Sequence, residues 1–275
     1  MKYPLQKWRL LITPPSPGAW NMAVDEAILE AVEQNQVLPS LRLYSWEPPC
    51  LSIGYAQPST DVDFVRLHTL GWDWVRRPTG GRAILHTDEL TYSVIAPLSD
   101  PRISGGVLQS YLRLSSALLT ALSTLKIPAL SKSDNSQVNN AVSSVVCFEV
   151  PSNYEITVDG KKLIGSAQAR RKKTMLQHGT FPLWGDLTRI TQVLIFPDES
   201  NRNEAGIRLL SRATTAERIL ERKISWQEAV NAFIFGFQTV LNLELTPTSL
   251  SDQEISRAEQ LRQKKYTHPS WLERI

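Results

Sequence analysis

The chain has few cysteines and no long apolar run. Cys50 and Cys147 are the two cysteines among 275 residues, too few for a disulfide scaffold and typical of a reducing compartment. Neither cysteine has neighbours at the spacing of metal ligands, so no metal site is predicted. No stretch reaches the roughly 18 apolar residues that a membrane-spanning helix needs, and residues 1–8 lack an apolar signal segment. We therefore expect a cytoplasmic protein without a membrane partner.

The chain also lacks a strong charge imbalance. Lysines and arginines number 30 against 27 acidic residues, which gives a formal net charge of +3. The aromatic residues do not alternate with basic ones as a nucleic-acid stacking surface requires, so no nucleic-acid partner is expected. The one basic cluster, residues 170–173, lies in a predicted turn. A solvated loop is its simplest interpretation, although such a surface could also help to dock an acidic protein.

Apolar patterning places most strands in the first two thirds of the chain and helices in the last third. Runs and alternation predict strands at 8–13, 41–45, 50–55, 72–77, 83–86, 89–96, 154–158, from 161 onward, and 175–181. Helical spacing predicts a helix that begins after an N-cap at Asn21, and another over 107–125 that Pro128 ends. Residues 131–144 are rich in Ser and Asn and are predicted to form a loop.

This pattern predicts an α/β (α+β) fold with a mixed β-sheet flanked by helices. We expect one catalytic domain over residues 1–245, followed by a short helical C-terminal extension over 246–275. Three capping-box patterns, which begin at Thr214, Ser225 and Ser251, predict helix starts in the C-terminal part.

A glycine-containing segment at 76–83 is the first candidate site. Gly80 and Gly81 permit a close approach of the backbone to a ligand, and the flanking Arg76 and Arg82 could pair with a phosphate or a carboxylate. The alternative is an ordinary turn with solvated arginines.

Two further segments could contribute to a site. His86 precedes two acidic residues and could act as a base, or simply occupy a turn. Small residues within the predicted strands at 165–168 and 177–180 indicate a close approach of a second backbone or a ligand.

The two cysteines have different surroundings. A lone cysteine is usually a small buried hydrophobic residue, and Cys50 fits that role because it begins an apolar strand. Cys147 follows a polar loop and precedes a hairpin that carries lysines. Cys147 is therefore the candidate reactive thiol.

The Asp-Gly pair at 159–160 predicts a two-residue hairpin turn. Its register pairs Lys162 with Thr157 and Lys161 with Val158. Alternation then places Lys162 on one face, shared with Glu155, Ile164 and Ser166. Lys161 points to the other face, with Val158 and Leu163. One lysine could thus face a pocket while its neighbour does not; the alternative is two exposed lysines.

Taken together, the segments 21–26, 76–83, 86–93, 160–168 and 177–179 resemble the biotin/lipoate protein ligase superfamily, in the same order. The similarity spans about residues 8–200. The stretches Arg-Arg-Pro-Thr-Gly-Gly-Arg-Ala, Asp-Glu-Leu-Thr-Tyr-Ser and Cys-Phe-Glu-Val-Pro-Ser look most like the cysteine-dependent octanoyltransferases that load the glycine-cleavage H protein. The resemblance implies the superfamily's catalytic-domain fold.

The resemblance also implies the roles of individual residues. Cys147 would be the nucleophile that carries the octanoyl group, and Lys162 would lower its pKa. The donor would be octanoyl-acyl carrier protein and the acceptor a lysine of a lipoyl domain or glycine-cleavage H protein, without a cofactor. The expected substrate-binding residues are Arg76, Thr79, Gly80, Gly81, Arg82, His86, Gly165, Ser166, Ala167, Gln168, His178 and Gly179.

Three alternatives stay open. ATP-dependent lipoate ligases resemble this chain, but they typically carry a third glycine in place of Arg82 and lack the cysteine at Cys147. An amidotransferase that moves the acyl group between carrier domains also uses a cysteine. A non-catalytic binder of lipoyl domains belongs to a different class, and the presence of both Cys147 and Lys162 argues against it.

Overall fold

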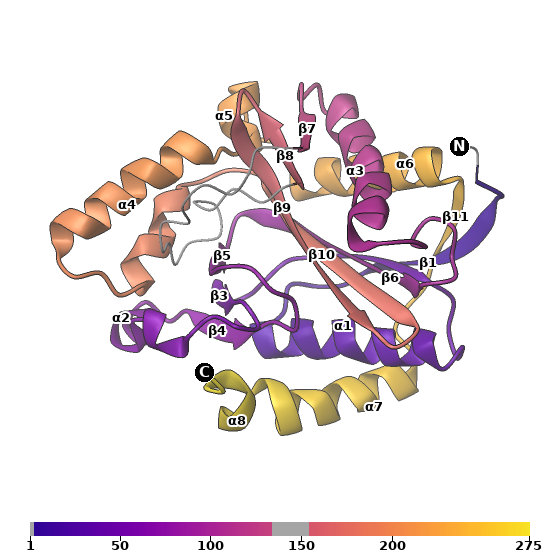
Figure 1. Ribbon diagram of the computed structural model, residues 1–275, viewed down its shortest axis with the longest axis horizontal. Coiled ribbons are helices and arrows are strands. Elements are labelled where there is room, and N and C mark those ends of the chain that lie inside the picture. Colours follow the sequence, from indigo (N-terminus) through magenta and orange to yellow (C-terminus); the bar gives the residue numbers. More distant parts are fainter. Residues whose placement is uncertain (1–2, 134–153) are drawn as a thin grey trace.

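The computed structural model describes residues 3–133 and 154–275. Its main element is an eight-stranded sheet with the order β11-β1-β2-β6-β10-β9-β8-β7 (Figure 1). β1 pairs in parallel with β2 and β11, and the other neighbours are antiparallel, so the sheet is mixed as predicted. The strands are β1 Gln6–Ile12, β2 Ser40–Tyr44, β6 Glu89–Pro97, β7 Leu130–Ser133, β8 Tyr154–Val158, β9 Lys161–Arg171, β10 Thr174–Pro182 and β11 Leu243–Pro247.

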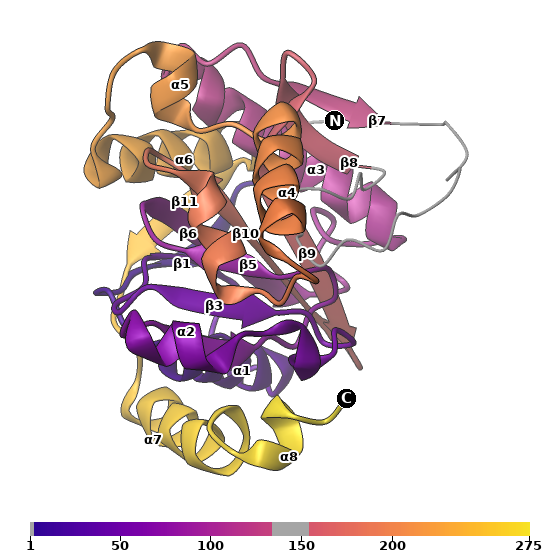
Figure 2. The same cartoon turned by 90° about the vertical axis from the view of Figure 1, so that its left-hand side faces the viewer.

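A small sheet with the order β4-β3-β5 lies between α2 and the large sheet (Figure 2). Its strands are β3 Cys50–Ile53, β4 Asp73–Arg76 and β5 Ile84–His86. The α-helices are α1 Gly18–Glu33, α2 Phe64–Thr69, α3 Val107–Thr124, α4 Glu199–Arg212, α5 Ala216–Leu220, α6 Trp226–Leu241, α7 Asp252–Leu261 and α8 Pro269–Leu272. Short 3₁₀ segments occupy Ser59–Asp61 and Leu187–Val193, and a π-helical turn occupies Arg262–Tyr266.

Within the described residues, every helix is too short or too polar to cross a membrane.

Helices cover both faces of the large sheet, as Figure 1 shows. α1 lies against one face with α7 outside it, and the packed pair α3 and α6 covers the other face. The two cores that result are apolar: Leu118 and Phe233 belong to the α3–α6 side, and Ile28 and Leu176 to the α1 side. Removing such side chains from water is the main contribution to the stability of the fold.

The start of α1 differs from the sequence-based expectation. The helix begins at Gly18, with Pro17 at the N-cap position, so the predicted N-cap at Asn21 is wrong. A proline suits this end because its φ is fixed and no backbone N–H is left unpaired. Asn21 lies inside the helix, and its Nδ2 donates to the carbonyl oxygens of Ser16 and Ser45, each at 3.0 Å.

Two of the three predicted capping boxes are confirmed, at Ser225 and Ser251. The third is wrong, because Thr215 and not Thr214 caps α5, where it accepts a hydrogen bond from the backbone N–H of Arg218 without a capping box. β7 and β11 were not predicted as strands. The expected boundary between residues 245 and 246 falls inside β11, so the sheet continues past it.

The hairpin register is confirmed, because Thr157 pairs with Lys162 and Val158 with Lys161. A bulge follows, since the next pair joins Ile156 to Ile164 and leaves Leu163 as the extra residue of β9. Leu163 and Ile164 are consequently both buried in the core. The prediction that Ile164 shares the face of Lys162 is wrong, because a bulge interrupts the alternation on which it was based.

Candidate functional site

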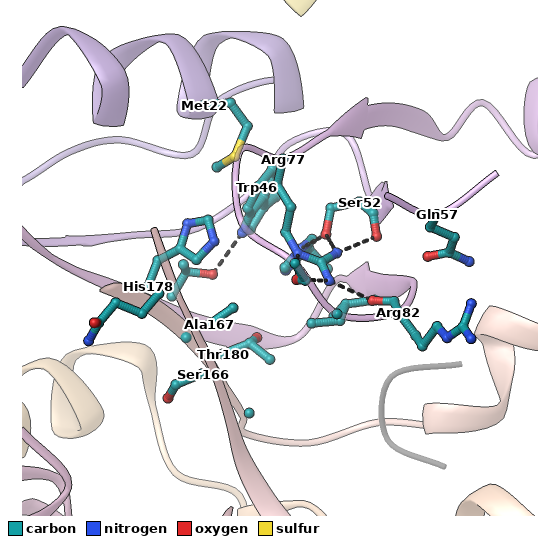
Figure 3. A pocket seen from close by; sticks show the side chains of 18 of the residues that line it. Met22, Trp46, Ser52, Gln57, Arg77, Arg82, Ser166, Ala167, His178 and Thr180 are labelled. Atoms are coloured by element: carbon teal, nitrogen blue, oxygen red, sulfur yellow. Dashed lines mark hydrogen bonds between the residues drawn. The ribbon is translucent and has the colours of Figure 1, made fainter. Parts of the chain in front are cut away.

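A cavity of about 570 Å³ lies between the large and small sheets (Figure 3). That volume is in the range of small-molecule sites. β9 and β10 of the large sheet form part of its wall, and β3, β5 and the loop at 80–82 form another part. The predicted residues that line it are Gly80, Gly81, Arg82, His86, Lys162, Gly165, Ser166, Ala167, Gln168, His178 and Gly179.

Three predicted residues are not placed on this wall. Cys147 lies outside the described residues. Thr79 lies behind the wall, where its Oγ1 is 2.7 Å from Nε2 of His178 and so holds that ring. Arg76 is directed elsewhere.

The guanidinium of Arg76 bonds to backbone carbonyls outside the cavity. Its Nη1 donates to the oxygens of Gly54 at 2.9 Å and Gln57 at 2.6 Å, and its Nη2 donates to that of Leu272 at 2.7 Å. Trp271 Nε1 donates in return to the Arg76 carbonyl at 2.9 Å. Arg76 is therefore outside the cavity lining, and it ties the 54–57 loop to α8.

The cavity also has lining residues that were not predicted: Met22, Tyr44, Trp46, Ser52, Ala56, Gln57, Arg77, Ile84, Thr91 and Thr180. Half of them come from strands whose sequences are apolar enough to resemble ordinary core. The sequence feature that could have identified such residues is a polar residue inside an apolar strand, as Ser52 is in β3.

Arg77 fixes the glycine loop to the small sheet. Its Nη2 donates to the carbonyl oxygens of Gly80 at 2.9 Å and Arg82 at 2.7 Å. Its Nη1 donates to the Ser52 carbonyl at 3.0 Å. Because a planar guanidinium holds several acceptors in fixed directions, it sets the shape of this wall.

Glycine is required where the loops meet. A Cβ on Gly54 would lie 1.9 Å from the carbonyl oxygen of Gly81, and one on Gly179 would lie 2.6 Å from Ser166 Oγ. Contacts this short do not occur for real side chains. The close approach expected in the small-residue strand at 177–180 is thus confirmed for Gly179.

A hydrogen-bonded line leads from Glu89 to the cavity wall. His86 Nδ1 is 2.7 Å from Glu89 Oε1, and His86 Nε2 is 2.8 Å from Ser52 Oγ. Burial alone would raise the pKa of Glu89, but His86 and nearby hydroxyl groups hold it below its ordinary value. The ionised carboxylate therefore accepts a hydrogen bond from Nδ1–H of His86. Trp46 stacks on this imidazole with ring centroids 4.0 Å apart.

A second buried carboxylate orients His178. Asp25 Oδ2 is 3.6 Å from His178 Nδ1, and Asp25 Oδ1 pairs with Arg42 Nη1 at 2.7 Å. Burial lowers the pKa of His178 below its ordinary value, although Asp25 opposes this shift. His178 is therefore neutral at physiological pH. Within residues 3–133 and 154–275, no three His, Cys, Asp or Glu side chains are arranged to hold a metal ion.

Lys162 brings a buried ammonium to the cavity wall. Its Nζ lies 2.8 Å from Oε1 of Glu155, and the two side chains are only 5% and 14% exposed. The predicted shared face of these two residues is confirmed. Lys161 is exposed, as the register requires.

A family model for the lipoyl protein ligase A/B catalytic domain matches residues 17–238. The chain belongs to this family. Octanoyltransferase LipM of Brevibacillus brevis is 38% identical over 97% of the chain and 99% of that protein, and its namesake from Kyrpidia tusciae is 41% identical over 97% and 98%. The chain is accordingly an acyltransferase of this family.

Solved structures agree with this membership. A bipartite lipoate protein ligase from Thermoplasma acidophilum has a TM-score of 0.80 at 26% identity, covering 97% of this chain and 96% of that one. Lipoate-protein ligase A bound with ATP has a TM-score of 0.78 at 27% identity, covering 97% and 98%. The fold is that of the lipoate protein ligases.

Proposed function

We propose that the chain transfers an octanoyl group from acyl carrier protein to the lipoyl-site lysine of glycine-cleavage H protein, through a thioester on Cys147. The setting would be protein lipoylation in the cytoplasm. The names of the full-length relatives support octanoyl as the acyl group, and the cavity volume suits a medium acyl chain.

The observation that carries the proposal is the position of Lys162. Its ammonium is buried in the wall of the cavity and is paired with Glu155. Cys147 precedes it by 15 residues in the sequence. A cation near a thiol stabilises the thiolate, which is the nucleophilic form.

The proposed reaction needs no external energy source. The thiolate of Cys147 attacks the donor thioester, the donor thiol leaves, and a new thioester forms at nearly equal free energy. The acceptor amine then attacks this thioester and releases Cys147, and the amide that forms is the more stable product. Backbone N–H groups of the glycine loop are candidates to stabilise the tetrahedral oxyanion.

Cys50 provides a matched control for Cys147. It is fully buried, and burial together with the charges of Asp73 and Glu89 raises the pKa of its thiol well above the ordinary value. A thiol of this kind is a poor nucleophile.

The test is intact-protein mass spectrometry after mixing with octanoyl-acyl carrier protein. A hydroxylamine-labile octanoyl adduct should form on wild type and Cys50→Ala and be absent from Cys147→Ala. An adduct on Cys50, or transfer that strictly requires ATP and free octanoate, would show that the proposed function is wrong. The second result would indicate a ligase.

A further inference from the structure

Arg82 differs from the other charged groups of the cavity wall. Within the part of the chain that the structure describes, its guanidinium makes no hydrogen bond or ion pair, and the residue is partly exposed. Lys162 is paired with Glu155. Arg77 donates to three backbone carbonyls. Among residues 3–133 and 154–275, Arg82 is thus a cation at the edge of the cavity without a partner of its own.

The backbone beneath Arg82 is held firmly. Its carbonyl oxygen accepts a hydrogen bond from Arg77 at 2.7 Å, and the next residue, Ala83, is fully buried. On the other side, Gly81 passes directly against Gly54. A cationic side chain on a fixed loop loses little entropy on binding, because only its own rotamers must be ordered.

Two buried carboxylates that contact residues of the cavity wall already have partners. Asp25 is paired with Arg42, and Glu89 is paired with His86. Figure 3 shows Arg82 extending from the loop on the side of the cavity where Gln57 lies, away from His178. The site therefore combines a cavity for an acyl chain with an available guanidinium at its edge, a group whose fork geometry matches a phosphate.

We propose that Arg82 binds the phosphate ester on the thiol arm of the acyl donor, and so holds the arm while its acyl chain occupies the cavity. This inference rests on the proposed function, because it assumes a phosphopantetheine thioester as the donor. It assigns donor recognition to one side chain and one phosphate group.

The experiment pairs a change in the protein with a change in the ligand. Octanoyl transfer is measured with two small donors, octanoyl-phosphopantetheine and octanoyl-pantetheine, which differ only in the phosphate. Arg82→Gln should lower kcat/KM for the phosphorylated donor by about tenfold or more, because a hydrogen bond between charged groups is lost. For the unphosphorylated donor, kcat/KM should change by less than about twofold, because that donor lacks the phosphate contact.

Two variants serve as comparisons. Arg82→Lys should retain part of the preference for the phosphorylated donor. Arg66→Gln removes an exposed arginine from α2, outside the cavity lining, and should leave kcat/KM unchanged for both donors.

If Arg82→Gln loses kcat/KM equally with both donors, or with neither, the proposal is overturned. The proposed function, octanoyl transfer, is not affected by that result. A loss of kcat/KM seen only with the complete octanoyl carrier protein would also overturn the proposal, because Arg82 would then contact the acidic surface of the carrier and not the phosphate. Failure of wild type to use any of these donors would instead refute the proposed function, and this inference with it.

Discussion

The ammonium of Lys162 and the carboxylate of Glu155 form an ion pair of 2.8 Å that is almost wholly buried. The pair joins β9 to β8, across the hairpin whose register places Lys161 in solvent. Because the cost of burying a lone charge is high, each partner stabilises the charged form of the other. Glu155 therefore holds the Lys162 ammonium at one point of the cavity wall.

Lys162→Ala should raise the pKa of the Cys147 thiol toward or above the ordinary value of about 8.5, because the cation that favours the thiolate is lost. The rate of iodoacetamide alkylation of Cys147 at neutral pH should fall, and the loss should shrink as the pH rises. Any loss of acyl transfer that persists at high pH reports lost oxyanion stabilisation.

Lys161→Ala is the control for this substitution and should behave like wild type. If the pH profile of alkylation for Lys162→Ala overlaps that of wild type, Lys162 does not lower the pKa of the Cys147 thiol. If the pH profile shifts in Lys161→Ala instead, Lys161 and not Lys162 is the lysine that acts on Cys147.

Arg76→Gln should destabilise the fold by about 2–4 kcal/mol, because buried carbonyl oxygens lose their donor. Urea unfolding measures this effect. The exposed Arg66 offers a comparison, and Arg66→Gln should stay within about 0.5 kcal/mol of wild type. An Arg76→Gln variant with unchanged stability and a raised KM would restore the binding role suggested by the sequence.

Gly54→Ala should be strongly destabilising, because its new Cβ would lie 1.9 Å from the carbonyl oxygen of Gly81. The cost of such overpacking is typically about 1–3 kcal/mol or more. Gly80→Ala has no atom within 4 Å of the added Cβ, so its thermal midpoint should remain near that of wild type. Equal midpoints for the two variants would show that the loops separate easily.

His178 should make the protein sensitive to mild acid. Its pKa is lowered in the folded state, whereas the unfolded chain titrates near the ordinary value of about 6.5. The resulting stability is fully present above pH 6.5, and is lost as the pH falls through the folded-state pKa, because the unfolded chain binds the proton more readily.

The measurement is urea unfolding between pH 7.5 and 5. His178→Gln should show a shallower loss of stability than wild type over this range. Parallel curves would mean that His178 does not contribute to the pH dependence.

The sequence predicted the parts of the molecule that depend on local chemistry. The turn at 159–160 set the pairing of Lys162, and the serine caps of α6 and α7 follow directly from their own residues. The contacts of Arg76 could not be predicted, because they come from a distant part of the chain. Arg76 is tied to α8 because Trp271 and Leu272 lie against it in the fold, and the local sequence around Arg76 contains no information about that contact.

The placement of β1 between β2 and β11 has a consequence for synthesis of the protein. β1 has a parallel neighbour that is made much later than β1 itself, since Gln6 pairs with Leu243. Until residues 243–247 leave the ribosome, one edge of β1 has no hydrogen-bonding partner, and an open strand edge invites pairing with other chains. The nascent chain therefore carries an incomplete sheet until these residues are made, and its open edge is a site where it can associate with other chains.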